Sequence, residues 1–219
     1  MTRSLLGWGV VAGAFYLTVG IVHGVVEPAF SFTEHPLSSL MLAPWGWVQA
    51  TNLILTGVMV LAAAVGFYRS VSPAAMQRRA GTAVGIYGVA LILSGIFEPD
   101  PVDGFPDATS TETTTTTSGF LHLTLGGVGL VALAASAVFI AQWYSGRGER
   151  QRARRSKAGA GVVGVGLVGG AALAATPVGV VLLWIAVVTG WAWLADTSIF
   201  LYRTVPHPDL HLRAAQQRA

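Results

Sequence analysis

The sequence predicts an all-α integral membrane protein, a single domain of six transmembrane helices in a Gly/Ala-rich bundle with both termini in the cytoplasm. Hydrophobic residues make up 53% of the 219 residues, charged residues only 11%, and the mean hydropathy is +0.62. A soluble domain would carry about 25% charged residues. Each apolar run is close to the ~20 residues that a helix needs to cross ~30 Å of hydrocarbon. The six runs lie at about 5–26, 45–67, 81–97, 119–144, 158–175 and 178–202, and 203–219 would form a cytoplasmic tail.

The first three runs carry features that are typical of membrane helices. The first follows Arg3 and is longer than the apolar core of a signal peptide, so we expect a helix that is retained. The second begins beside Trp45 and Trp47, and tryptophan is enriched at membrane interfaces. Small residues four apart, at Gly20 and Gly24 and again at Gly81 and Gly85, predict close contacts between helix backbones.

The last three runs have recognisable starting points. Ser118 is a suitable N-cap for the fourth helix. Thr176 and Pro177 predict a tight hairpin between the fifth and sixth helices, because proline is favoured in the first helical turn. Two overlapping G-x-G-x-x-G matches within 159–169 lack the preceding strand of a dinucleotide site, so they indicate helix packing, as do Gly166 and Gly170.

The charges predict the orientation. All 13 Lys and Arg residues fall in segments that six spans would place on one side of the membrane, and the positive-inside rule makes that side the cytoplasm. A basic pI near 9.7 therefore reflects topology, and we expect no nucleic-acid partner. The outer loops would carry seven of the ten acids and no base, an anionic surface. These acids are Glu27, Glu34, Glu98, Asp100, Asp103, Asp107 and Glu112.

The candidate functional residues gather in the two outer polar stretches, 27–39 and 97–122. The first choices are His35, Ser38, Asp100 and His122, and the second choices are His23, Glu27 and Glu98. Histidines with carboxylates are a set that zinc accepts, with His35, Asp100 and His122 as the ligands if a metal binds. A hydroxyl beside a His/Asp pair is a set that acyl transfer uses. The same residues could instead hydrogen-bond loop carbonyls and cap helices. The absence of cysteine removes thiolate chemistry from consideration.

Three further polar features are given structural interpretations. Asp196 is the only acid within a span and lies near its inner end, where it could pair with a loop arginine. The run 109–118, TSTETTTTTS, predicts a flexible outer linker without a chemical role. His207 and His211 flank Asp209 in the tail, where Pro206 and Pro208 disfavour the helix that would make them a metal pair.

Several short motifs resemble the prokaryotic integral-membrane family called domain of unknown function 998. They are HPLSS before the second helix, QATNLILTG within it, FEPDP after the third helix and GFLH at the start of the fourth. The resemblance covers most of the chain and implies a six-helix membrane protein with no established activity. Its matching polar positions are His35, Ser38, Asp100 and His122. The threonine-rich insert between Asp100 and His122 departs from the family pattern.

Two functions from different classes follow. The first is a non-catalytic module of the cell membrane that binds, transports or senses a lipid or small molecule through a polar, acidic outer rim. The second is a metal-dependent hydrolase of a lipid-like substrate, with a divalent metal such as zinc. Alkaline ceramidases and progestin receptors surround zinc with similar residues on seven helices, but this chain has six predicted spans and no His-x-x-x-His in the last one.

Overall fold

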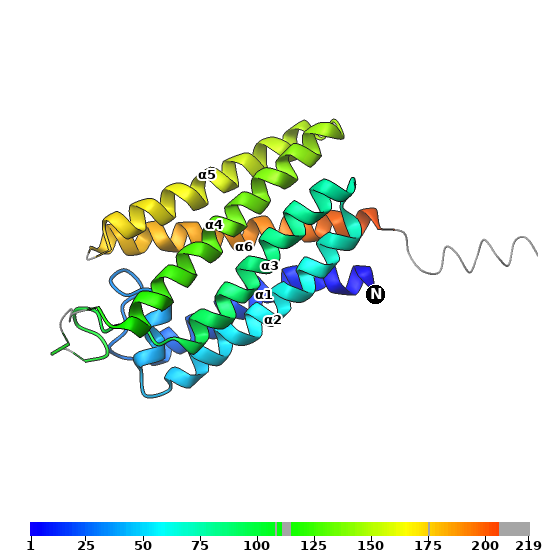
Figure 1. The fold of residues 1–219 in the computed structure, drawn as a ribbon. Helices are drawn as coiled ribbons and strands as arrows, with labels where there is room; N and C mark the ends of the chain where they lie inside the picture. Colours follow the sequence, from blue (N-terminus) through cyan, green and yellow to red (C-terminus); the bar gives the residue numbers. More distant parts are fainter. Residues whose placement is uncertain (108, 111–114, 175, 206–219) are drawn as a thin grey trace, which may run out of the picture.

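The protein is a bundle of long α-helices, which confirms the all-α prediction. The computed structural model describes residues 1–107, 109–110, 115–174 and 176–205. Within these ranges a short 3-10 helix, η1 (Leu37–Leu42), lies between the first two α-helices (Figure 1). The α-helices are α1 (Thr2–Val26), α2 (Gly46–Ser70), α3 (Ala74–Ile96), α4 (Thr117–Gly146), α5 (Arg150–Ala172) and α6 (Pro177–Thr204).

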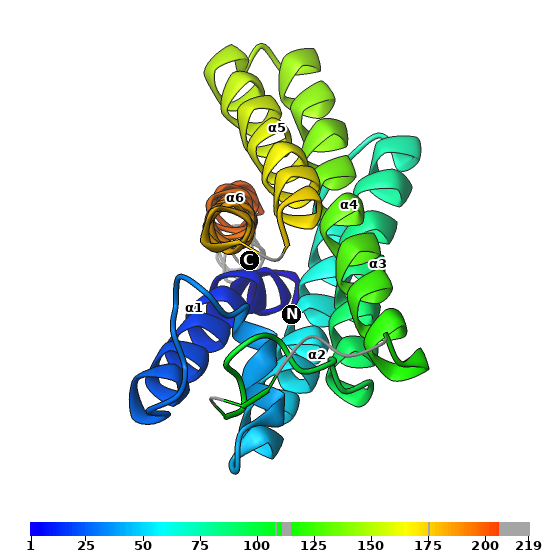
Figure 2. The same cartoon turned by 90° about the vertical axis from the view of Figure 1, so that its left-hand side faces the viewer.

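The helices pack in chain order around the bundle. Each α-helix contacts the next, and α6 returns to pack against α1, so the first and last helices are neighbours (Figure 2). The N-terminus, the α2–α3 and α4–α5 turns and the end of α6 lie at one end, and the longer loops 27–45 and 97–107 lie at the other (Figure 1). The basic segments in the described part of the chain therefore share one end, which we call the basic end, as the sequence predicts.

Five helices, α1 to α4 and α6, are long and apolar enough to cross a membrane. The exception is α5, because its first two turns carry five of the basic residues, Arg150, Arg152, Arg154, Arg155 and Lys157. Its apolar part, 158–172, is about 22 Å long at 1.5 Å per residue. Apolar side chains also cover the outside of the bundle, among them Val25, Val131 and Val165 at 70%, 59% and 69% exposure. Such a surface requires a bilayer or an equivalent apolar environment.

Several predicted boundaries need correction. The helix predicted over 81–97 begins at Ala74, and the one predicted over 158–175 begins at Arg150 and ends at Ala172. Arginine, lysine and glutamine are good helix formers, so a helix continues beyond the apolar part that hydropathy detects. Helix α6 also takes in residues 203–204, which were predicted as tail. The tail segment with His207 and His211, which was not expected to form a metal pair, lies outside the described residues.

The glycine pairs have different neighbours. Side chains at Gly166 and Gly170 would meet the backbone of α6, so this pair brings α5 and α6 together as predicted. The prediction is wrong for Gly20 and Gly24, where added side chains would meet Leu37, Phe30 and Phe32 from the loop after α1. This face of α1 is covered by Phe30 and Phe32 of the following loop and by Leu37 of η1 rather than by another membrane-length helix.

Candidate functional site: the loop rim and a groove along α2 and α3

His35 is held inside the rim by its own loop and by the loop after α3. Its side chain is 4% exposed and packs against the rings of Phe30 and Phe105, with centroids 5.7 and 5.2 Å away. The Ser31 backbone N–H donates to His35 Nδ1 over 3.0 Å. Because Nδ1 accepts this bond, the proton of the neutral ring is on Nε2, which lies 3.2 Å from the Asp103 carbonyl oxygen and donates to it. The imidazole thus joins two loops 68 residues apart.

His122 fastens the start of α4 to the end of α3. The carbonyl oxygens of Ser94 and Phe97 both lie 2.9 Å from its Nδ1. Carbonyls can only accept, so the ring is protonated at Nδ1 and donates to both. In return, the Ser94 hydroxyl donates to the His122 carbonyl over 3.5 Å. The last carbonyls of an α-helix have no partner within the helix, and the buried His122 supplies that partner here.

Asp100 stabilises the N-terminus of α4 together with Thr116. The Thr116 backbone N–H and hydroxyl donate to the Asp100 carboxylate, the hydroxyl over 2.6 Å. Thr116 Oγ1 in turn accepts from the Gly119 N–H over 3.0 Å, so Thr116 is the N-cap and the prediction of Ser118 in that role is wrong. A carboxylate at this position also interacts favourably with the positive end of the helix dipole. A Cβ at Gly119 would overlap the carboxylate, which makes glycine necessary there.

The threonine-rich run is therefore only partly a linker. Its last residues, from Thr116 onward, cap and begin α4, and Ser118 donates to the Glu98 carbonyl over 2.9 Å. At its start, the Thr109 hydroxyl and N–H donate to Asp107 and hold the pKa of that carboxyl below its usual value. Residues 111–114 lie outside the described part of the chain.

The other predicted rim residues are placed as follows. Ser38 lies in η1, half-buried, and no described residue hydrogen-bonds its hydroxyl. His23 is 5% exposed, and neither ring nitrogen has a partner in the described ranges. Glu27 is one turn further along α1 and half-buried, and Glu98 is exposed.

The rim ties its loops together without forming one centre. His35, Asp100 and His122 each hydrogen-bond to other groups, and within the described residues no hydrogen bond joins any two of them; the Asp100 carboxylate acts on His122 only through longer-range electrostatic attraction. Across residues 1–107, 109–110, 115–174 and 176–205, no group of three His, Asp or Glu side chains is arranged to hold a metal ion. Glu34, Glu98, Asp103 and Asp107 are exposed on this side, so the rim presents carboxylates outward.

A second feature, which the sequence interpretation missed, is a groove along the outer surface of α2 and α3, continued by α4. Its volume is about 520 Å³, and its lining is apolar except for two hydroxyl residues, Tyr68 and Thr82. Their oxygens lie 2.6 Å apart across the two helices. Gly85 deepens the groove, because an added Cβ would meet only the Ala64 Cβ, at 3.9 Å. The sequence contained a signal for it in Arg78, Thr82 and Gly85, which repeat along one helical face.

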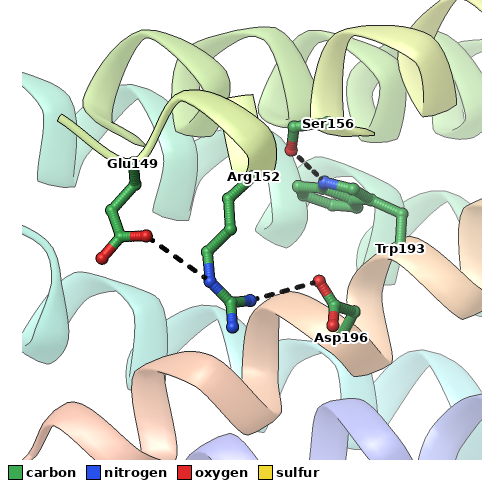
Figure 3. Close-up of polar contacts among 5 residues, drawn as sticks. All are labelled: Glu149, Arg152, Ser156, Trp193 and Asp196. Atoms are coloured by element: carbon green, nitrogen blue, oxygen red, sulfur yellow. Dashed lines mark hydrogen bonds and ion pairs between the residues drawn. The ribbon is translucent and has the colours of Figure 1, made fainter. Parts of the chain in front are cut away.

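At the basic end, Asp196 pairs with an arginine as predicted, but that arginine lies on α5 rather than in a loop. Arg152 Nη1 lies 3.7 Å from Asp196 Oδ2 and Arg152 Nε lies 3.9 Å from Glu149 Oε2, so the guanidinium stands between the two carboxylates (Figure 3). Beside this network, the Trp193 indole N–H donates to Ser156 Oγ over 2.5 Å (Figure 3). The Arg152–Asp196 pair and the Trp193–Ser156 hydrogen bond both join α5 to α6.

A comparison with known protein families supports the family resemblance of the sequence motifs. The family described as "Protein of unknown function (DUF998)" matches residues 10–197, which includes every candidate rim residue and the groove. The chain belongs to this family. Neither a curated protein nor a solved structure matches it. Membership in DUF998 confirms the predicted resemblance, and the family description assigns no activity to the rim or to the groove.

Proposed function

We propose that this DUF998 protein is a non-catalytic, multi-pass module of a prokaryotic cell membrane that binds a lipid or a similar amphiphile. In this proposal all six helices span the bilayer, both termini are cytoplasmic, and the acidic rim faces outward. The rim histidines and Asp100 then serve to close the outer end of the bundle. A binding role is favoured because both ring nitrogens of His35, the Asp100 carboxylate and His122 Nδ1 are already engaged with backbone groups and a helix cap.

The observation that carries the proposal is the groove between α2 and α3. A cleft of about 520 Å³ with apolar walls and a few polar groups has the size and composition of a ligand pocket. It opens on the surface that faces lipid, where Val65, Ile86 and Val89 are exposed at 42%, 44% and 46%. An acyl chain is the ligand that such a surface meets at high concentration.

The hydrolase alternative receives less support. It needs His35, Asp100 and His122 around one metal ion, but both ring nitrogens of His35 have protein partners, and no group of three His, Asp or Glu side chains in the described residues is arranged to hold a metal. Ser38 has no hydrogen-bonded base among the described residues that would activate it as a nucleophile.

The test fills the groove and measures bound lipid. We expect Gly85→Leu to reduce the number of phospholipids that native mass spectrometry detects on the purified protein, because the new side chain occupies the acyl chain's space. Gly127→Leu on α4 is the matched control, since nothing lies within 4 Å of a Cβ at that position. Equal lipid retention by wild type and both variants would disprove binding in the groove.

A further inference from the structure

The groove has the length of one lipid leaflet. From Gly81 to Leu93 it follows α3 over twelve residue steps, or about 18 Å at 1.5 Å per residue. Half of a ~30 Å hydrocarbon core is about 15 Å. The end at Thr82 lies toward the α2–α3 turn, and the end at Leu93 also includes Leu125 of α4. A single acyl chain that enters from the basic end would therefore fill the groove and stop near the bilayer centre.

At the basic end of the groove, a pair of hydroxyls is followed along α3 by an arginine. Tyr68 and Thr82 share one hydrogen bond, which uses only one of their two hydroxyl protons, so the other can be donated to a ligand oxygen. Arg78 precedes Thr82 by four residues and lies on the same face of α3, about 6 Å nearer the end of the bundle. An ester oxygen would meet the hydroxyl pair, and a phosphate would meet the guanidinium.

The charges near the basic end of the groove favour an anionic ligand. Arg69, Arg78 and Arg79 are all exposed around the α2–α3 turn. In the described part of the chain, the acids of the basic end are Glu149 and Asp196, and both contact Arg152 of α5. Helix α5 makes no contact with α2 or α3. A cationic headgroup such as choline would thus find no carboxylate at the groove.

We infer that the groove binds one anionic phospholipid from the leaflet at the basic end. One acyl chain lies between α2 and α3, the ester region bonds the Tyr68–Thr82 hydroxyl pair, and the phosphate contacts Arg78. This inference rests on the proposed lipid-binding function and adds the headgroup class, the leaflet and the residue that selects them. It also gives the basic α2–α3 turn a role beyond setting the topology.

The experiment measures headgroup preference on the full-length protein. Purified protein in detergent is mixed with equal concentrations of phosphatidylglycerol and phosphatidylcholine that carry the same acyl chains, and native mass spectrometry gives the ratio of the two single-lipid adducts. We expect wild type to favour phosphatidylglycerol and Arg78→Gln to lower the ratio about fivefold, the contribution of one basic residue near an anionic lipid. Arg154→Gln, the same charge change on distant α5, should leave the ratio unchanged. Thermal stabilisation by each lipid in solution provides a second readout.

The possible outcomes distinguish a failure of the headgroup assignment from a failure of lipid binding in the groove. Loss of both lipids in Gly85→Leu, with a headgroup ratio that Arg78→Gln does not change, would keep groove binding and overturn the anionic assignment. Equal effects of Arg78→Gln and Arg154→Gln would assign the preference to overall charge and also overturn it. If Gly85→Leu retained lipid as wild type does, groove binding itself would fail.

Discussion

His122 provides the sharpest test of the rim, because its imidazole is the donor for two carbonyls at the end of α3. We predict that His122→Ala lowers the free energy of unfolding by about 1 to 3 kcal/mol, the usual cost of unpaired buried polar groups. The loss should appear as a lower Tm in detergent, while bound lipid stays at wild-type stoichiometry.

Ser38→Ala is the control, since this rim hydroxyl has no partner in the described residues. Its Tm should stay within the equivalent of about 0.5 kcal/mol of wild type. A His122→Ala protein as stable as this control would show that the α3 carbonyls do not depend on the imidazole.

The sequence identified the polar rim residues but not their partners. His35, Asp100 and His122 stand out as polar groups beside apolar helices, and that is a local property. The partner of His35 Nε2 is a carbonyl 68 residues away, and a backbone carbonyl has no residue type that a pattern could reveal. The cap at Thr116 was missed because neighbouring threonines and Ser118 are chemically similar, and only the helix start at Thr117 distinguishes them.

The pairing of α5 with α6 depends more on one buried hydrogen bond than on the visible ion pair. Ser156 is 2% exposed and accepts from Trp193, which is itself 8% exposed. Asp196 and Arg152 are 57% and 32% exposed and 3.7 Å apart, so their ion pair lies outside the core and is too long for a direct hydrogen bond. We predict that Ser156→Ala costs about 1 to 3 kcal/mol of unfolding free energy, because the indole N–H loses its acceptor.

Asp196→Asn serves as the comparison on the same pair of helices and should cost at most about 1 kcal/mol, as expected for a largely exposed ion pair. Thermal unfolding of both variants in one detergent gives the order directly. A larger loss in Asp196→Asn would mean that the Arg152 network, rather than the indole bond, holds these helices together.

Hydropathy predicted each of the described α-helices but not its full extent, and it did not predict η1. Apolar runs locate the part of a helix that faces lipid, and all six predicted runs overlap α-helices. The basic turns that begin α3 and α5 are helical because their residues favour helix, which a hydropathy pattern does not register. The groove was missed for a related reason. Gly81 and Gly85 fit the spacing of a helix contact, but only Gly81 is packed tightly against α2, at Tyr68, whereas a Cβ at Gly85 would meet only the Ala64 Cβ at 3.9 Å.

The orientation of the molecule and the role of α5 can be tested together, because the chain contains no cysteine. Helix α5 is about 34 Å long at 1.5 Å per residue, enough to cross the bilayer if its basic side chains extend toward the headgroups. The α5–α6 turn lies at the same end as the long loops (Figure 1). We therefore expect a membrane-impermeant maleimide to label Ala29→Cys and Ala174→Cys in intact cells. Ala75→Cys, equally exposed but at the basic end, should react only after permeabilisation. Protection of Ala174→Cys alone would show that α5 does not span the membrane. The opposite labelling of all three positions would show that the protein has the opposite orientation.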